Sequence, residues 1–360
     1  MEEQMDLYTD FLISTVGQAT GTGLSLVSGG VISHDQVSRL LSKNSFDSKA
    51  LWLAVKTTVR SHENEEGCLV FDDMVAEKAY TDENDLICWH WDHSKGRSVK
   101  GINLLTAFYH TQGEQEELPL RVPISFSLIT KPIKYRELKT CKEKRKSEKT
   151  KNELMREMIT QSLNNQLKFK YVLADSWFAS AENMRFIHKK NKTFIFDMKT
   201  NRKAALTDDA RNEGQWTRID ELDIPDNTPV KVWLKDLEIP ILLTKQNFTN
   251  KDGSTGVRFL VSNDLNLSDD QFTTLYKKRW SVEEYHKSLK QNAAFTKSPT
   301  RTIKTQKNHF FASILAYVKL EKLKFVNGMN HFALKAKIQI EATKAAIKEL
   351  NQLKFKLARA

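Results

Sequence analysis

The order of apolar runs between residues 68 and 200 restricts the fold more than any other feature of the chain. Four runs of strand length, separated by polar turns, come first: CLVFDD, LICWHWDHS, GINLLTAFYHT and LPLRVPISFSLIT. A strand, a helix and another strand follow in YVLAD, SAENMRFIHKKN and TFIFDMKT. Apolar runs of this length bounded by turn residues are typical of strands. Strands followed by alternating helix and strand predict a mixed α/β sheet.

Helical patterns flank this region, and a second β pattern follows it. The first sixty residues read as helices joined by glycine-bearing turns, which fits either a helix-turn-helix-like module or a plain helical subdomain. Strand-like pieces then alternate with the turns PDNTP and NKDGSTG, which predicts a β-rich insertion. The expected parts are an N-terminal helical region (1–62), an α/β core (63–200), the insertion (201–262), a return to the core (263–300) and a basic C-terminal helical region (301–360).

Composition is that of an ordinary soluble globular protein. The chain has 360 residues, 40% of them hydrophobic and 28% charged, which suits two or three domains. Its three cysteines have no C-x-x-C spacing, so they support neither a disulfide framework nor a zinc site. No apolar run reaches the ~18–20 residues of a membrane span, and the start MEEQMDLYTD is too acidic for a signal peptide. We therefore expect a cytoplasmic protein.

The positive charge is concentrated in two segments. The whole chain carries a formal net charge of +11. Residues 131–151 hold ten Lys or Arg against three Glu, and residues 270–360 hold nineteen against six acidic residues. Either segment alone fits a solvated helix face. Together they favour nucleic acid as the partner, because Lys and Arg that neutralise phosphates dominate such binding.

Several carboxylates stand where they could converge. Asp72 and Asp73 come at the expected end of one buried strand, and Asp175 comes at the end of another. Open α/β sheets bind their ligands at strand ends, so side chains there can meet at one site. The alternative for each aspartate alone is that it starts a turn or caps a helix.

A further acid lies on a predicted helix that carries a polar stripe. At 100° per residue, four side chains of SDDQFTTLYKKRWSVEEYHKSLKQ fall within about 60° of one another: Tyr276, Arg279, Glu283 and Lys290. A stripe of these residue types indicates a polar partner. An Arg–Glu pair on an exposed helix face is the alternative.

The spacing Y-x-x-R-x-x-x-E-x-x-x-x-x-x-K in this helix resembles the YREK signature of DDE transposases from bacterial cut-and-paste insertion sequences. The segments VFDDM and VLADSWF are similar to the first-acid and second-acid segments of that family. Two further segments also resemble sequences of this family, namely WHWDHSKGRSVKGINLL and KRWSVEEYHKSLK. The resemblance extends from about residue 66 to residue 300.

This resemblance implies an RNase H-like core in which Asp73, Asp175 and Glu283 are catalytic and bind two divalent metal ions. Mg²⁺ is the expected ion, with Mn²⁺ as a substitute, because hard oxygen ligands select such cations. The family's first-acid motif reads acid, Asp, Thr, which favours Asp73. Met74 replaces the threonine here, so Asp72 stays open as the alternative.

The resemblance also implies partners and DNA contacts. A homodimer would bind the terminal inverted repeats of its element and then a target duplex, in the bacterial cytoplasm and on the nucleoid. The implied contacts are cations and a tyrosine on the helix, and insertion tryptophans that could hold a flipped base: Tyr276, Arg279, Lys287, Lys290, Trp216 and Trp233. Packing in a core is the alternative for both tryptophans.

Two other functions stay open from the sequence. The chain could be an inactive relic that represses by binding DNA, or a nuclease without strand transfer. No P-loop or dinucleotide fingerprint is present, so no nucleotide cofactor is expected. In WHWDH, strand alternation separates His90 and Asp92 from Trp91 and His93, so these side chains are not expected to share a metal ion.

Overall fold

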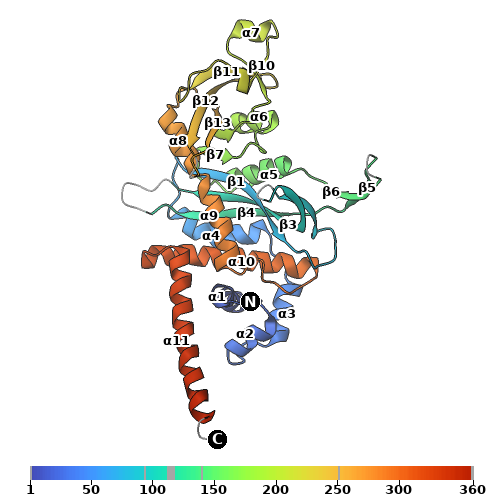
Figure 1. Ribbon diagram of the computed structural model, residues 1–360, viewed down its shortest axis with the longest axis vertical. Helices are drawn as coiled ribbons and strands as arrows, with labels where there is room; N and C mark the ends of the chain where they lie inside the picture. The colour runs from blue at the N-terminus through green and yellow to red at the C-terminus, as the bar shows by residue number, and fades with distance from the viewer. Residues whose placement is uncertain (1, 93–94, 112–117, 139–140, 250–251, 358–360) are drawn as a thin grey trace. The chain divides into compact units, whose positions relative to one another are not determined.

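The computed structural model describes the chain except residues 1, 93–94, 112–117, 139–140, 250–251 and 358–360. The described residues form two compact units, whose elements are labelled in Figure 1. One unit spans residues 55–283 and holds the described strands. The other combines residues 1–54 with residues 284–360 and is helical.

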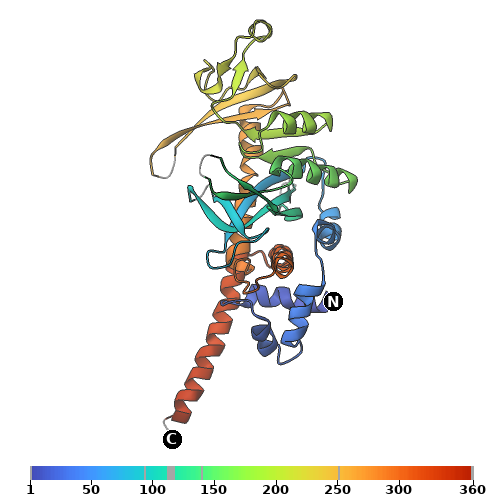
Figure 2. The same cartoon turned by 90° about the vertical axis from the view of Figure 1, so that its right-hand side faces the viewer.

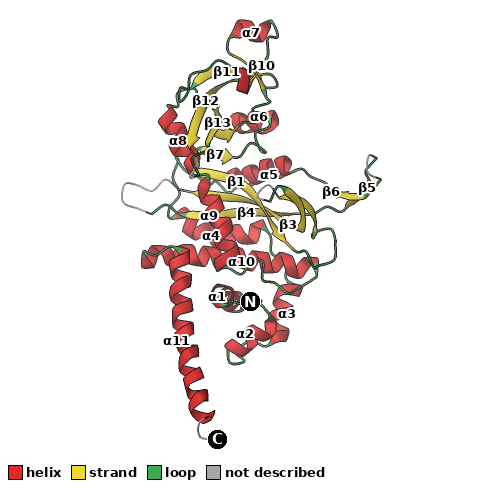
Figure 3. Cartoon of the chain, in the orientation of Figure 1, coloured by secondary structure: helices red, strands yellow, loops and turns green. Residues whose placement is uncertain are grey.

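A mixed sheet of eleven strands forms the frame of the 55–283 unit (Figure 3). The strand order is β10-β9-β11-β12-β13-β8-β7-β1-β3-β2, and β4 also pairs with β3. The bounds are β1 Cys68–Glu77, β2 Cys88–Asp92, β3 Arg97–His110, β4 Arg121–Ile129, β7 Tyr171–Ala174, β8 Thr193–Asp197, β9 Lys203–Ala205, β10 Thr217–Arg218, β11 Val230–Leu234, β12 Pro240–Thr249 and β13 Thr255–Ser262.

The three strands β1, β7 and β8 run parallel in the middle of this sheet. All four residues of β7 are buried, and so is the first part of β1, Cys68–Phe71. Strands covered on both faces require near-continuous apolar runs, which is the pattern in the sequence. The predicted mixed α/β class is confirmed.

Two helices cover one face of the sheet. Figure 2 shows α5 (Lys151–Asn164) and α6 (Ala181–Lys189) side by side. A capping box between Thr150 and Glu153 begins α5, and Ser180 caps α6. α5 packs against β3 and β4, while α6 packs against β8. This arrangement brings the first residue of α5 to the middle of β1.

The segment 201–262 is β-rich and extends the core sheet. Its last strand, β13, pairs antiparallel with β8 through Val261 and Phe196. The backbone hydrogen bonds of β8 therefore carry the sheet on into β12, β11, β9 and β10. The other elements of this segment are the short helix α7 (Asp208–Asn212) and a 3-10 turn (Ile219–Glu221).

The basic segment before α5 forms a hairpin of its own. β5 (Ile133–Arg136) pairs antiparallel with β6 (Glu143–Lys146), outside the main sheet. All four residues of β5 are exposed. The hairpin presents Lys134, Arg136, Lys144 and Lys146 to solvent, whereas Arg145 is mostly buried and pairs with Asp85 at 2.6 Å.

The helical unit is built on α10 (Ile303–Asn327). α1 (Glu2–Ser14), α3 (His34–Lys43) and α11 (His331–Leu357) pack against α10, and α2 (Gly21–Val27) packs against α3. α4 (Ser48–Arg60) and α9 (Trp280–Asn292) each begin in one unit and end in the other. Within the described residues, no helix combines the length and hydropathy needed to cross a membrane.

Candidate active site

Three aspartates lie level with one another on adjacent parallel strands. The register pairs Phe71 of β1 with Ala174 of β7, and Ala174 with Phe196 of β8. The next residue in each strand line is an aspartate: Asp72, Asp175 and Asp197. Partners in register point to the same face of a sheet, and neighbouring strands are about 4.8 Å apart. The fold therefore places three carboxyl groups in one row.

Asp73 points to the opposite face, because successive side chains of a strand alternate. Its Oδ2 atom accepts a hydrogen bond of 2.6 Å from the Asn103 side chain and forms an ion pair of 2.7 Å with the Lys151 ammonium group. Lys151 begins α5, on the face that α5 covers. The strand also continues past both acids to Glu77, so the prediction that Asp72 and Asp73 end it is wrong.

The predicted helix over residues 268–291 consists of two helices. α8 (Asp269–Lys277) begins at the Ser268 cap, and α9 begins at Trp280. At the junction the N–H groups of Arg279 and Val282 donate to carbonyl groups three residues back, which is the tighter 3-10 pattern. The prediction of one continuous helix is therefore wrong. Tyr276 lies in α8, Arg279 at the junction and Glu283 in the first turn of α9.

Arg279 joins the α9 acid to the row of aspartates. Its Nη2 atom is 2.7 Å from Glu283 Oε1, and its Nη1 atom is 3.7 Å from Asp72 Oδ2. The guanidinium group is mostly buried. The positive charge of Arg279 also acts to lower the pKa of Asp175 and the pKa of Asp197. Arg279 therefore serves as the shared counter-charge of the site.

Burial and mutual repulsion make these carboxyl groups hard to ionise. Burial, the largest cause, raises the pKa of Asp72 to about 7, and the charges of Asp175 and Asp73 act in the same direction. Burial also raises the pKa of Asp175 and of Asp197, and each is raised further by a neighbouring aspartate. A site with several acids and raised pKa values is suited to a cation.

The donor set fits a hard divalent ion. Asp72, Asp175, Asp197 and Glu283 offer oxygen atoms only, which is the chemistry that Mg²⁺ and Mn²⁺ prefer. Among the described residues, no three acidic, His or Cys side chains converge tightly enough to form a ready-made metal site. Asp72 and Glu283 instead form ion pairs with Arg279, and a metal ion bound by these two acids would have to displace its guanidinium group.

Tyr276 lines a cavity next to Arg279. The tyrosine is buried, with the guanidinium groups of Arg258 and Arg279 at 5.3 and 5.6 Å from its ring centroid. The cavity has a volume of about 330 Å³ and also contains the aromatic rings of Phe248 and Trp280. Side-chain amides complete its lining, from Asn227, Gln246 and Asn247. Aromatic rings, amides and cations are the groups that bind a nucleotide.

The other predicted DNA contacts lie elsewhere. Lys287 and Lys290 are exposed on α9, in the helical unit, and Lys287 Nζ is 5.1 Å from the centroid of the Phe332 ring. Trp216 and Trp233 are half-buried in the extended part of the sheet and do not line the cavity beside Arg279. The guanidinium group of Arg211 already covers Trp233, at 3.9 Å from its ring centroid.

Two residues of the site were missed by sequence reasoning. Asp197 follows the buried run TFIF just as Asp175 follows YVLA, so the same pattern could have identified it. Trp177 is 46% exposed, and its backbone N–H donates to Asp175 Oδ1 at 3.0 Å. The ammonium groups of Lys151 and Lys199 lie 5.5 and 5.1 Å from its ring centroid. The two lysine contacts depend on tertiary structure and leave no local signal.

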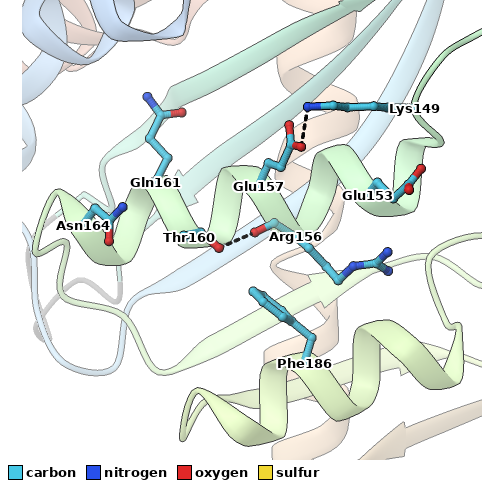
Figure 4. Close-up of a pocket in the computed structure, with 8 residues that line it drawn as sticks. All are labelled: Lys149, Glu153, Arg156, Glu157, Thr160, Gln161, Asn164 and Phe186. Atoms are coloured by element: carbon cyan, nitrogen blue, oxygen red, sulfur yellow. Dashed lines mark hydrogen bonds and ion pairs between the residues drawn. The ribbon is translucent and has the colours of Figure 1, made fainter.

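A separate cavity lies between α5 and α6 (Figure 4). It is a hollow of about 480 Å³ bordered by Arg156, Thr160 and Phe186, among others. Lys149 pairs with Glu157 at 2.5 Å on its rim. None of the four acids described above lines it. We attribute no chemistry to this cavity.

Comparison with known families identifies a domain in the chain. Residues 138–319 match the family model of the transposase DDE domain, about half of the chain. The matched range includes Asp175, Asp197 and Glu283, whereas Asp72 and Asp73 precede it. No curated protein matches the sequence. The large mixed sheet with flanking helices is that of an RNase H-like core.

We predict that Asp72→Asn stabilises the metal-free protein at pH 8. The pKa of Asp72 is about 7 in the folded protein, whereas an unfolded aspartate titrates near ~3.9. The folded state therefore binds this proton more tightly, and the stability contributed by this group falls as the pH rises from about 4 to 7. Asparagine removes the cost of ionising this side chain in the folded protein, which amounts to up to about 4 kcal/mol at pH 8. The melting temperature in EDTA measures the resulting gain in stability.

The difference in melting temperature between the variant and the original protein should shrink as the pH is lowered to 5, where Asp72 is already protonated. Asp73→Asn is the matched control. It breaks the ion pair with Lys151 and should lower the melting temperature at pH 8. An Asp72→Asn variant that melts below the original protein at pH 8 would contradict this account.

Proposed function

The chain belongs to the transposase DDE domain family, and on that premise we propose that it cleaves and joins DNA strands at the ends of an insertion sequence. The observation that supports this most is the row of aspartates in register beside Arg279 and Glu283. A buried cluster of acids that shares one arginine is unstable by itself. It becomes favourable when metal ions and a phosphate backbone enter the site.

We propose that Asp72, Asp175 and Glu283 hold Mg²⁺, with Mn²⁺ as a substitute. When bound there, a pair of such ions would supply activation of the attacking oxygen and neutralisation of charge on the leaving oxygen of a phosphodiester. Asp197 lies in the same row and keeps the site negative on the side of β8. Arg279 offers a planar fork that binds phosphate oxygens in two parallel hydrogen bonds, so DNA provides it with a new partner.

The first acid of the set is better supplied by Asp72 than by Asp73. Asp72 lies in register with Asp175 and within 3.7 Å of Arg279. Asp73 lies on the face that α5 covers and already has Lys151 and Asn103 as partners. Asp73 is therefore proposed to fix the first turn of α5 against β1, which is a positioning role. This reverses the preference drawn from the family's motif.

Contacts with DNA are proposed around the same junction. Tyr276 and Arg279 face the cavity that Phe248 and Trp280 also line, so an extruded base could stack there. Phe248 is thus a better candidate for the insertion's aromatic contact than Trp216 or Trp233. Lys287 and Lys290, both exposed on α9, are proposed to neutralise phosphates of the bound DNA.

A homodimer is proposed to form through α11. Every residue from Glu341 to Phe355 is exposed, and a lone helical segment of this length is marginal in water. Exposed side chains at alternating spacings of four and three residues mark one stripe of the helix, namely Ala336, Ile340, Thr343, Ile347, Leu350 and Lys354. This spacing is that of heptads, with Ile340 and Ile347 at a and Leu350 at d, a combination that favours parallel pairs.

We predict that Asp72→Asn, Asp175→Asn and Glu283→Gln each lower cleavage of end-containing DNA about a thousandfold with Mg²⁺, since losing a metal ligand costs about 4 kcal/mol. Mobility-shift assays should give the same affinity for DNA ends as the original protein. Asp73→Asn should retain cleavage within about tenfold. Asp82→Asn, at an exposed position, is the control for a lost surface charge.

Gel analysis of joined products separates the proposed transposase from a nuclease. Strand transfer by the original protein supports the proposal, and cleavage without joined product contradicts it. Full activity of all three acid variants would reject the site. If Asp73→Asn is inactive and Asp72→Asn is active, the first acid is Asp73.

We predict that Ile347→Asp weakens self-association of the full chain at least tenfold, because it places a charge in the heptad stripe. Sedimentation equilibrium measures the dissociation constant. Ala345→Asp adds the same charge on the opposite side of the helix and should leave association unchanged. Equal effects of the two substitutions, or a monomeric original protein, would contradict pairing through α11.

A further inference from the structure

The edge strand β2 has its largest apolar side chains on the outside. Trp89 and Trp91 are each 54% exposed, whereas Cys88 and His90, which alternate with them along the strand, are buried. A slip of one residue in the pairing of β2 with β3 would reverse this and bury both indoles. Burying a large apolar side chain contributes roughly 1.5–3 kcal/mol, so the observed register gives up stability.

Specific contacts hold this register in place. The Asn84 side-chain oxygen accepts hydrogen bonds of 2.9 Å from the N–H groups of Leu86 and Ile87, just before β2. Inside the sheet, Cys88 Sγ lies 3.3 Å from His90 Nε2. Five residues of β2 pair in register with β3. The outward direction of both tryptophans is therefore fixed by the fold.

The two indoles share a sheet face with Asp72. The register pairs Trp89 with Lys100 and Trp91 with Ser98 of β3. Further along β3, Thr106 pairs with Asp72 of β1. Even-numbered residues of β3 between 98 and 106 point to one face, and no bulge interrupts the strand there. Six residues along the strand and two strands across amount to roughly 20 Å. The side chains of Ile102, Leu104 and Thr106 between them are buried, so the exposed indoles form a surface separate from Asp72.

Positive charge accompanies the indoles. Lys100 lies directly opposite Trp89 on the same face. Lys131 donates a hydrogen bond of 2.6 Å from its ammonium group to the Trp89 carbonyl oxygen. Aromatic faces combined with Lys side chains are typical of surfaces that bind single-stranded nucleic acid, where bases stack on rings and cations follow the backbone. A protein partner would need acidic groups to meet the same lysines.

We propose that Trp89 and Trp91 form a stacking platform for two successive unpaired nucleotides of a DNA strand, with Lys100 and Lys131 beside the adjoining phosphates. Side chains two residues apart on a strand are roughly 6.6 Å apart, close to the step between neighbouring nucleotides of an extended strand. Bases inside a duplex cannot reach the rings without leaving the stack, so the platform selects unpaired DNA. Strand cleavage at DNA ends, the proposed function, would produce such unpaired DNA, and the platform rests on that proposal.

Fluorescence anisotropy of the full chain with a labelled 15-nucleotide single strand and its blunt duplex, in EDTA, tests the platform. Trp89→Ala and Trp91→Ala should each weaken single-strand binding about 5- to 100-fold, because base stacking on a ring contributes ~1–3 kcal/mol. Duplex binding should change less than twofold. Trp91→Phe should restore part of the single-strand affinity, because phenylalanine keeps a stacking face.

Tyr80→Ala is the matched control, because Tyr80 is a fully exposed aromatic residue of the same unit. It should leave both affinities unchanged. Unchanged single-strand binding in both tryptophan variants would overturn the platform, and so would equal losses for single strand and duplex. Weaker self-association of these variants with normal DNA binding would assign the indoles to a protein contact and also overturn it. Because the binding assay contains EDTA and no metal ion, its result does not depend on whether the protein cleaves DNA. A failure of the platform is therefore distinguishable from a failure of the cleavage proposal.

Discussion

Repulsion between carboxylates in register is the constraint on which the active-site unit depends. Parallel pairing of β1, β7 and β8 forces Asp72, Asp175 and Asp197 to one level, about one strand spacing apart. Burial makes their ionisation costly, and the Arg279 guanidinium group offsets that cost. Arg279 lies at the break between α8 and α9 and is close to both Asp72 and Glu283. The sheet, the helix junction and the charge balance thus form one arrangement.

The same constraint explains why two adjacent aspartates have different environments. Alternation sends Asp72 toward Arg279 and Asp73 toward Lys151, so each has a cation of its own on opposite faces of β1. Lysine at the start of a helix is opposed by the helix dipole, and Asp73 compensates for it. We interpret the pair as one acid for chemistry and one for holding α5. The indoles of β2 point to the same side of the sheet as Asp72.

Sequence reasoning succeeded where local pattern determines structure. Buried runs such as YVLA predicted the core strands, and the Ser268 cap predicted where the helix α8 begins. It failed where long-range contacts decide. The break between α8 and α9 at Arg279 was not predicted, and its guanidinium group lies near Asp72, which is far away along the chain. The proposed preference for Asp72 over Asp73 also depends on which face α5 covers, and no local pattern gives this. The joining of residues 201–262 to the core through β13 and β8 is likewise a pairing that no local pattern reveals.

Metal-directed cleavage of the polypeptide tests the central claim most directly. Bound Fe²⁺ reduces added hydrogen peroxide to hydroxyl radicals, and ascorbate returns the Fe³⁺ to Fe²⁺. The radicals cut the backbone next to the bound ion, and sequencing the fragments locates the cuts. The account predicts cuts beside Asp72, Asp175 and Glu283, suppressed by excess Mg²⁺ and absent from the Asp175→Asn variant. Cuts confined to other segments, or cuts that Mg²⁺ does not suppress, would contradict a metal site at this row of aspartates.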